Sequence, residues 1–164
     1  MKKLVISMLL AGLVFGLASF AELAPKIGSP APGLELPNLD GQTINLQSYI
    51  NKKPVVLIFF ASWSKSCQTE LNDMQEIFLA GDGNLEVLAV SFDKKQKELK
   101  AFLAKNKYSF PFVTDKSLST LDKFQILIIP TTFCINRSGA IDKILVDYDE
   151  NVKRAIAEWV LQNG

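Results

Sequence analysis

The hydrophobic and polar positions of this 164-residue chain follow two different periods. The run "PVVLIFF" at 54–60 is apolar on both faces, which predicts a central buried strand, and "LEVLAVSF" at 85–92 predicts the next strand. Between them, the segment 65–79 repeats its apolar residues at the spacing of an amphipathic helix. The pattern therefore predicts a strand, a helix and a second strand, with the two strands parallel in one sheet.

The predicted helix 65–79 follows a polar corner at the end of the first strand. Ser64 stands directly before the helix and belongs to the residue types that commonly cap a helix N-terminus. The apolar positions of the helix are Cys67, Leu71, Met74 and Phe78. Glu70 falls between these positions, so we expect it on the polar side of the helix with its acidic neighbours.

The rest of the chain predicts further elements around this unit. We expect Asp93 to cap a helix over 94–105, where a stripe of apolar residues is set among lysines. The other expected elements are a hairpin over 34–46, a strand at 110–113, a helix at 117–124, a hairpin of strands 131–136 and 141–147, and a closing helix over 151–162. Together they predict an α/β fold in which one mixed sheet carries helices on both faces.

The first 21 residues differ from the rest of the chain. Two lysines precede a long apolar run, and the small residues Ser19 and Ala21 are spaced like a signal-peptidase site. We expect cleavage after Ala21 and export to the periplasm; the alternative is a retained segment that anchors the protein to the outer face of the inner membrane. Residues 22–33 contain three prolines and two glycines and predict a linker, which leaves 34–164 as one domain.

Charge and composition narrow the classes of function. Two of the 18 basic residues lie in the signal segment, so the exported chain would hold 16 basic and 17 acidic residues. This balance gives no reason to expect a nucleic-acid partner, and a membrane contact is expected only if the signal segment is retained. The chain has no histidine and no phosphate-binding glycine loop, so neither a metal nor another cofactor is expected.

Several stretches also match the pattern of a known family. They are "IGSPAPGLELPNLDGQTINLQSY" at 27–49, "PVVLIFFASW" at 54–63, "VSFD" at 90–93 and "IIPTTFCINRSG" at 128–139. With these motifs the chain resembles the thioredoxin superfamily and, within it, the exported TlpA/ResA-type thiol-disulfide oxidoreductases. The resemblance implies a thioredoxin-like fold, in which the helix and strand between Lys94 and Val113 are an insertion after the second central strand.

The resemblance also implies where the active site lies. In the family the corner reads Trp-Cys-x-x-Cys, in which the first cysteine attacks a disulfide and the second resolves the mixed disulfide. The matching residues here are Trp63, Ser64, Lys65, Ser66 and Cys67, so the attacking position holds a serine. A serine hydroxyl is scarcely ionised without an adjacent base, so we do not expect ordinary dithiol exchange.

Other site residues are implied by the same resemblance. Pro130 matches the family's cis-proline and, together with Trp63, Lys65 and Ile129, is expected to bind a protein thiol or disulfide partner. Ile58 matches the strand position at which relatives carry a polar, proton-handling residue. This second departure again argues for altered or lost redox chemistry.

Three hypotheses for Cys67 are open at this point. In the first, Cys67 is a small core residue, and the domain is a redox-inactive module that binds or assembles partners. In the second, the helix N-terminus and Lys65 favour a reactive thiolate at Cys67, although Cys134 lies too far along a late strand to resolve a mixed disulfide. In the third, "SKSCQTE" resembles the peroxiredoxin pattern and Cys67 is a peroxidase thiol, but the arginine of that pattern has no counterpart, since Arg137 and Arg154 both fall on late elements.

Overall fold

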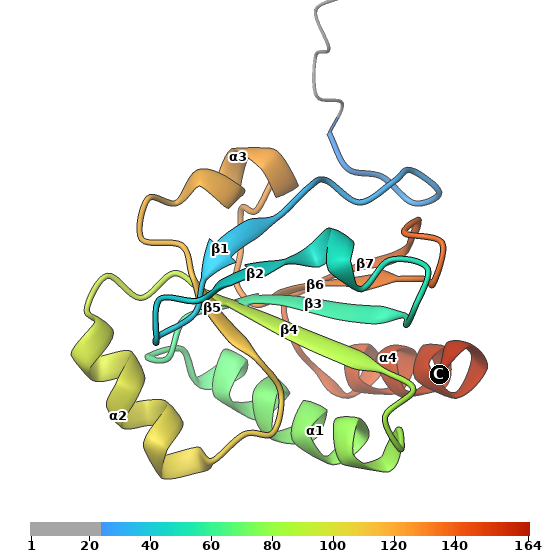
Figure 1. The fold of residues 1–164 in the computed structure, drawn as a ribbon. Helices are drawn as coiled ribbons and strands as arrows, with labels where there is room; N and C mark the ends of the chain where they lie inside the picture. The colour runs from blue at the N-terminus through green and yellow to red at the C-terminus, as the bar shows by residue number, and fades with distance from the viewer. Residues whose placement is uncertain (1–23) are drawn as a thin grey trace, which may run out of the picture.

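The computed structural model describes residues 24–164, which form a sheet covered on both faces (Figure 1). The predicted signal segment 1–21 lies outside this range. The strands of the main sheet are β3 (Val55–Phe60), β4 (Glu86–Ser91), β5 (Phe112–Thr114), β6 (Thr131–Ile135) and β7 (Ile141–Val146). Their order is β5-β4-β3-β6-β7, with β3 parallel to β4 and antiparallel to β6. The parallel pair predicted around the first helix is therefore confirmed.

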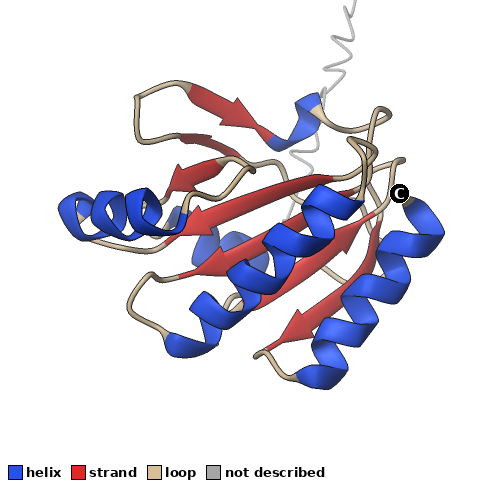
Figure 2. Ribbon diagram, turned by 90° about the horizontal axis from the view of Figure 1, so that it is seen from below, coloured by secondary structure: helices blue, strands red, loops and turns tan. Residues whose placement is uncertain are grey.

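The helices lie on both sides of this sheet. They are α1 (Lys65–Ala80), α2 (Gln96–Asn106), α3 (Ser119–Phe124) and α4 (Glu150–Asn163), and a short 3-10 helix, η1 (Leu46–Ser48), follows a hairpin of β1 (Glu35–Pro37) and β2 (Thr43–Asn45). The helices α1 and α4 lie side by side across one face (Figure 2), whereas α3 and the hairpin cover the other (Figure 1). This arrangement confirms the expected mixed α/β fold.

The central strand β3 divides the core into two layers. All six of its residues are buried, because helices cover one face and the hairpin with α3 covers the other. Val56, Ile58 and Phe60 pack in the layer that contains α1 and α4. Val55, Leu57 and Phe59 pack in the layer that contains Phe124 of α3 and Leu36 of β1. The run that is apolar on both faces thus has the fully buried environment predicted for it.

The segment before the hairpin is bound to the sheet at the start of β7. The N–H of Gly28 donates to the carbonyl of Ile141 at 2.8 Å, and the N–H of Ile141 donates to the carbonyl of Ser29 at 2.9 Å. Part of the predicted linker is therefore hydrogen-bonded to the domain. Within residues 24–164, no helix combines the length and the hydropathy that crossing a membrane requires.

Asp93 does not cap α2, contrary to our expectation. The helix begins after Lys95, which makes no side-chain cap hydrogen bond. Asp93 is only 3% exposed, and its carboxylate accepts hydrogen bonds from the N–H and hydroxyl of Ser62, at 2.9 and 2.8 Å, and from the hydroxyl of Ser91 at 2.8 Å. The prediction was wrong because these donors turn the carboxylate inward, where it connects the ends of β3 and β4.

We expect Asp93→Ala to destabilise the fold, because it leaves the polar groups of Ser62 and Ser91 buried without an acceptor. The loss should be about 3 kcal/mol in the free energy of unfolding, since each buried unsatisfied donor costs on the order of 1–3 kcal/mol. Urea unfolding measures this loss. The control is Asp40→Ala at an exposed turn, which should stay within about 0.5 kcal/mol of the native protein. Equal unfolding midpoints for the two variants would contradict the role of Asp93 as the buried acceptor for Ser62 and Ser91.

Candidate functional site

The corner between β3 and α1 is fixed by short-range hydrogen bonds. Ser64 is extended, with φ −82° and ψ 124°, and its hydroxyl accepts from the N–H of Cys67 at 3.4 Å, which confirms the predicted helix cap. The carbonyl of Ser62 accepts from the side-chain amide of Gln68 at 2.7 Å. Because Ser62 is held inward by Gln68 and Asp93, the following residue faces outward, and the Trp63 side chain is 73% exposed.

The structure brings Pro130 to this corner. The Ile129–Pro130 peptide bond is cis, as the resemblance implied. The carbonyl of Pro130 accepts from the N–H of Asp147 at 2.8 Å, and the Asp147 carboxylate accepts from the hydroxyl of Ser66 at 3.2 Å. Asp147 therefore links the cis-proline to the first turn of α1. Of the other predicted partner-binding residues, Lys65 is exposed and Ile129 is half-buried.

Cys67 is a buried thiol in a partly acidic environment. Its side chain is fully buried in the core layer below α1. Burial raises the pKa of the Cys67 thiol; the Ser64 hydroxyl and the Ala61 backbone oppose this shift, and the charge of Glu70 adds to it. The net direction is opposite to the one expected from the helix N-terminus and Lys65. At neutral pH the geometry therefore favours the neutral thiol over the thiolate.

The second cysteine offers no resolving thiol at this corner. Cys134 is free and fully buried, and burial raises the pKa of its thiol to about 12. It pairs with Val56 across β6 and β3, whereas Thr132 pairs with Ile58. Cys134 thus lies four residues beyond Pro130, about 13 Å along the strand, whereas a disulfide requires Cα atoms within about 7 Å.

Glu70 is buried, so the prediction that placed it on the polar side of the helix was wrong. Its side chain is 1% exposed, and one carboxylate oxygen accepts from the hydroxyl of Thr132 at 2.5 Å. The other oxygen has no hydrogen-bond partner among the described residues. Burial raises the pKa of Glu70 to about 7; the charges of Asp147 and Asp73 add to this shift, and the Thr132 hydrogen bond opposes it.

The buried face of α1 explains this error. Its buried residues are Cys67, Glu70, Leu71 and Met74, a stripe wide enough to include the position three residues after the cysteine. Thr132, the hydrogen-bond partner of Glu70, pairs with Ile58 in the sheet. An acid therefore does lie behind Cys67, but the helix supplies it rather than the strand position of Ile58. The i, i+3 spacing from Cys67 was the signal that could have identified it.

The arginines lie away from the corner. Arg137 follows β6, whose last residue Ile135 pairs with Val55 at the start of β3, so it lies at the other end of the sheet from Ser64. Arg154 is exposed on α4. Neither arginine therefore stands next to Cys67, as the peroxiredoxin pattern would require. Residues 24–164 also contain no group of three or more cysteine and acidic side chains placed to hold a metal ion.

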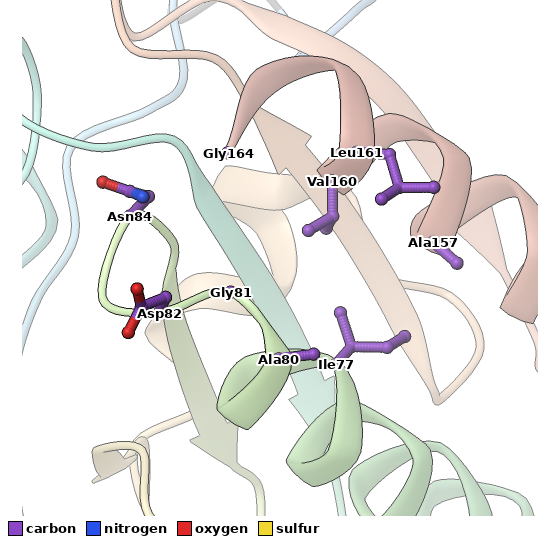
Figure 3. A pocket seen from close by; sticks show the side chains of 9 residues that line it. All are labelled: Ile77, Ala80, Gly81, Asp82, Asn84, Ala157, Val160, Leu161 and Gly164. Atoms are coloured by element: carbon purple, nitrogen blue, oxygen red, sulfur yellow. The ribbon is translucent and has the colours of Figure 1, made fainter.

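One hollow in the surface lies far from this corner. It has a volume of about 410 Å³ and lies between the C-terminal ends of α1 and α4, where Ile77, Val160 and Leu161 form apolar walls (Figure 3). Asp82 is its one ionisable lining residue. Ser64 and Cys67 are at the opposite end of α1. This hollow therefore contains none of the residues that the family resemblance places in the active site.

Glu70 should make the stability of the protein fall as the pH rises. Between the ordinary pKa of 4.5 and the folded value of about 7, the unfolded chain loses this proton while the folded protein keeps it, so a rising pH favours unfolding. Relative to Glu70→Gln, the native protein should lose up to about 3 kcal/mol of unfolding free energy between pH 4.5 and pH 8. Urea unfolding at several pH values measures this difference.

The matched control is Glu76→Gln, which changes an exposed carboxylate on the same helix. The difference between this variant and the native protein should stay constant with pH. A constant difference for Glu70→Gln as well would show that Glu70 is ionised at its ordinary pKa in the folded protein.

Comparison with known proteins places this geometry in a family. A model of the AhpC/TSA family matches residues 27–144. The thiol-disulfide oxidoreductase ResA of Geobacillus thermodenitrificans is 30% identical over 149 residues, which cover 88% of this chain and 85% of the relative. The thioredoxin-like protein YneN of Bacillus subtilis is 32% identical over 128 residues, which cover 76% and 74%.

A solved structure supports the same fold. A structure assigned as a thiol:disulfide interchange protein DsbE, from Chlorobium tepidum, superposes with a TM-score of 0.75 at 27% identity and covers 85% of this chain and 98% of that one. The shared feature is the thioredoxin-like fold, a five-stranded mixed sheet with helices. The chain therefore belongs to the AhpC/TSA family of thioredoxin-like proteins, among relatives that are ResA-type thiol-disulfide oxidoreductases.

Proposed function

We propose that this protein is an exported member of the ResA-type oxidoreductases that binds a partner protein at the corner of Trp63, Ser64 and Pro130, without the two-thiol exchange of the family pattern. The observation that carries the proposal is Ser64, which occupies the position of the attacking cysteine. Its hydroxyl caps α1, so the residue has a structural role that needs no thiol. Export rests on the signal pattern of residues 1–21.

The thiol that remains is poorly suited to exchange. Cys67 is fully buried, and burial raises the pKa of its thiol, whereas thiol-disulfide exchange needs an accessible thiolate. Trp63 is exposed to solvent, and so are Leu127 and Ile128 in the segment before Pro130. An exposed surface next to a position that holds serine instead of cysteine supports binding of a partner protein rather than catalysis of thiol exchange.

A single-thiol reaction is the second candidate function, and Glu70 is the observation that favours it. Its buried carboxyl lies on the same face of α1 as Cys67, and its pKa of about 7 suits a group that gives or takes a proton at neutral pH. In this reaction the Cys67 thiol would lose its proton to Glu70 and its thiolate would attack a partner's disulfide. A mixed disulfide would form, the partner's other sulfur would leave as a thiolate, and a thiol from outside the chain would resolve the product.

The reactivity of Cys67 distinguishes the two candidates. In the native protein at pH 7 we expect Cys67 to react with iodoacetamide more than about ten-fold more slowly than in the urea-unfolded chain, because burial limits both access and ionisation. Mass spectrometry of the Cys67 and Cys134 peptides follows both sites in one sample. The buried Cys134 is the internal control, and similar slow rates support the binding role. Rapid modification of Cys67 alone would favour the single-thiol reaction.

Restoring the first thiol tests whether the rest of the corner is intact. We expect Ser64→Cys to catalyse the reduction of insulin by dithiothreitol, because Trp63, the cis-proline and Glu70 are already in place. The native protein should show only the uncatalysed rate. Ser66→Cys is the control, since it adds a thiol to the same turn at the wrong position. Native activity equal to that of Ser64→Cys would contradict the proposal.

A further inference from the structure

An exposed apolar ridge stands beside the candidate site. Residues 126–129, which precede the cis-proline, are all aliphatic, and the side chains of Leu127 and Ile128 are 94% and 53% exposed. A single exposed leucine is common on protein surfaces, but a run of apolar residues with adjacent exposed members is characteristic of a surface that contacts a partner. We refer to residues 126–129 as the apolar ridge.

Two adjoining hollows connect the apolar ridge to Trp63. The first, of about 300 Å³, lies between the apolar ridge, Phe92 and Lys94. The second, of about 370 Å³, lies between Trp63 and the same two residues. Both hollows have Phe92 and Lys94 in their lining, so they adjoin, and we refer to the two together as the groove. Each hollow is near the lower limit of pockets that hold small molecules, so the groove suits individual side chains of an extended segment better than a cofactor.

The groove contains one lysine that has no ion-pair partner among residues 24–164. Besides Lys94, its ionisable lining residues are Asp93, Lys95 and Glu98. Asp93 is buried and accepts hydrogen bonds from two serines, and Lys95 pairs with Glu98 at 2.9 Å. Lys94 is exposed at the junction of the two hollows and has no ion-pair partner among residues 24–164. A carboxylate beside an apolar side chain complements this arrangement.

We propose that the groove binds an extended segment of a partner protein in which an aliphatic residue is flanked by an acidic one, and that Lys94 selects the acidic residue. The inference rests on the proposed function, because it describes the partner of that same corner. The aliphatic side chain lies against the apolar ridge and Phe92, and the carboxylate lies next to Lys94. A lipid surface fits less well, because membrane binding uses a broad apolar face with several basic residues rather than a groove with one lysine.

Titration of the ¹⁵N-labelled protein with blocked nonapeptides tests the proposal by NMR. One peptide has a central leucine between two glutamates, a second has lysines in place of the glutamates, and a third has serine in place of the leucine. The glutamate peptide should bind about three-fold more tightly than the lysine peptide, the size expected for an exposed ion pair. The Trp63 indole and the amides of the apolar ridge should shift, and the buried Trp159 indole should not.

Paired variants separate the contributions of charge and apolar contact. Lys94→Glu should reverse the preference between the two charged peptides, whereas Lys97→Glu, at an exposed position that does not line the groove, should leave it unchanged. Leu127→Ser should weaken binding of the glutamate peptide about ten-fold, as expected when an aliphatic contact is lost. Leu161→Ser, which lies on α4 in the hollow beside the C-terminal end of α1 and is 87% exposed, should have no effect.

The remaining outcomes identify which idea fails. Equal affinity for the two charged peptides, unchanged by Lys94→Glu, would overturn the selection by Lys94 and leave the proposed binding corner standing. Shifts that avoid both Trp63 and the apolar ridge would overturn the groove as well. Binding to vesicles of phosphatidylcholine and phosphatidylglycerol that is lost in Leu127→Ser, with no peptide binding, would assign the apolar ridge to lipid and overturn this inference.

Discussion

The candidate site depends on the buried carboxylate of Asp93. It accepts hydrogen bonds from Ser62 at the end of β3 and from Ser91 at the end of β4, and so it joins the carboxyl ends of two parallel strands. Binding sites in α/β sheets form at this edge. Because Ser62 is held inward, Trp63 must face solvent, and Ser64 is left in the extended conformation from which it caps α1. The carboxylate of Asp93 and the side-chain amide of Gln68 thus both hold the residue that precedes the exposed tryptophan.

At Cys67, burial outweighs the field of the helix. A helix N-terminus favours a negative charge by about 0.3–1 kcal/mol. Burial of an ionisable group can shift its pKa by several units, each worth about 1.4 kcal/mol. The charge of Glu70 acts in the same direction as burial. The first turn of α1 therefore holds a neutral thiol, although the helix N-terminus by itself acts to lower the pKa of that thiol.

The proposed absence of an attacking thiol is compatible with membership of an oxidoreductase family, because the scaffold and the reaction depend on different atoms. The sheet, the cis-proline and the hydrogen bond between Pro130 and Asp147 hold this corner without any contribution from residue 64. A serine at that position caps the helix, and in the proposed function it takes the place of the nucleophile. Trp63, Leu127 and Ile128 are exposed, and in the proposed function they are the residues that a partner contacts.

The sequence by itself determined the elements and their order. The apolar runs, the helical spacing after Ser64 and the turn residues identified the sheet, its parallel pair and α1, because burial and backbone geometry impose those patterns locally. The cis-proline and the active-site corner came from motifs of the family. Asp93 and Glu70 were placed wrongly, because an acidic residue is polar in the local pattern, and the spacing of Glu70 from Cys67 hints at its burial without naming its hydrogen-bond donor. Only the tertiary structure brought Ser62 to Asp93 and Thr132 to Glu70, and those two contacts decided how the corner is held and what surrounds Cys67.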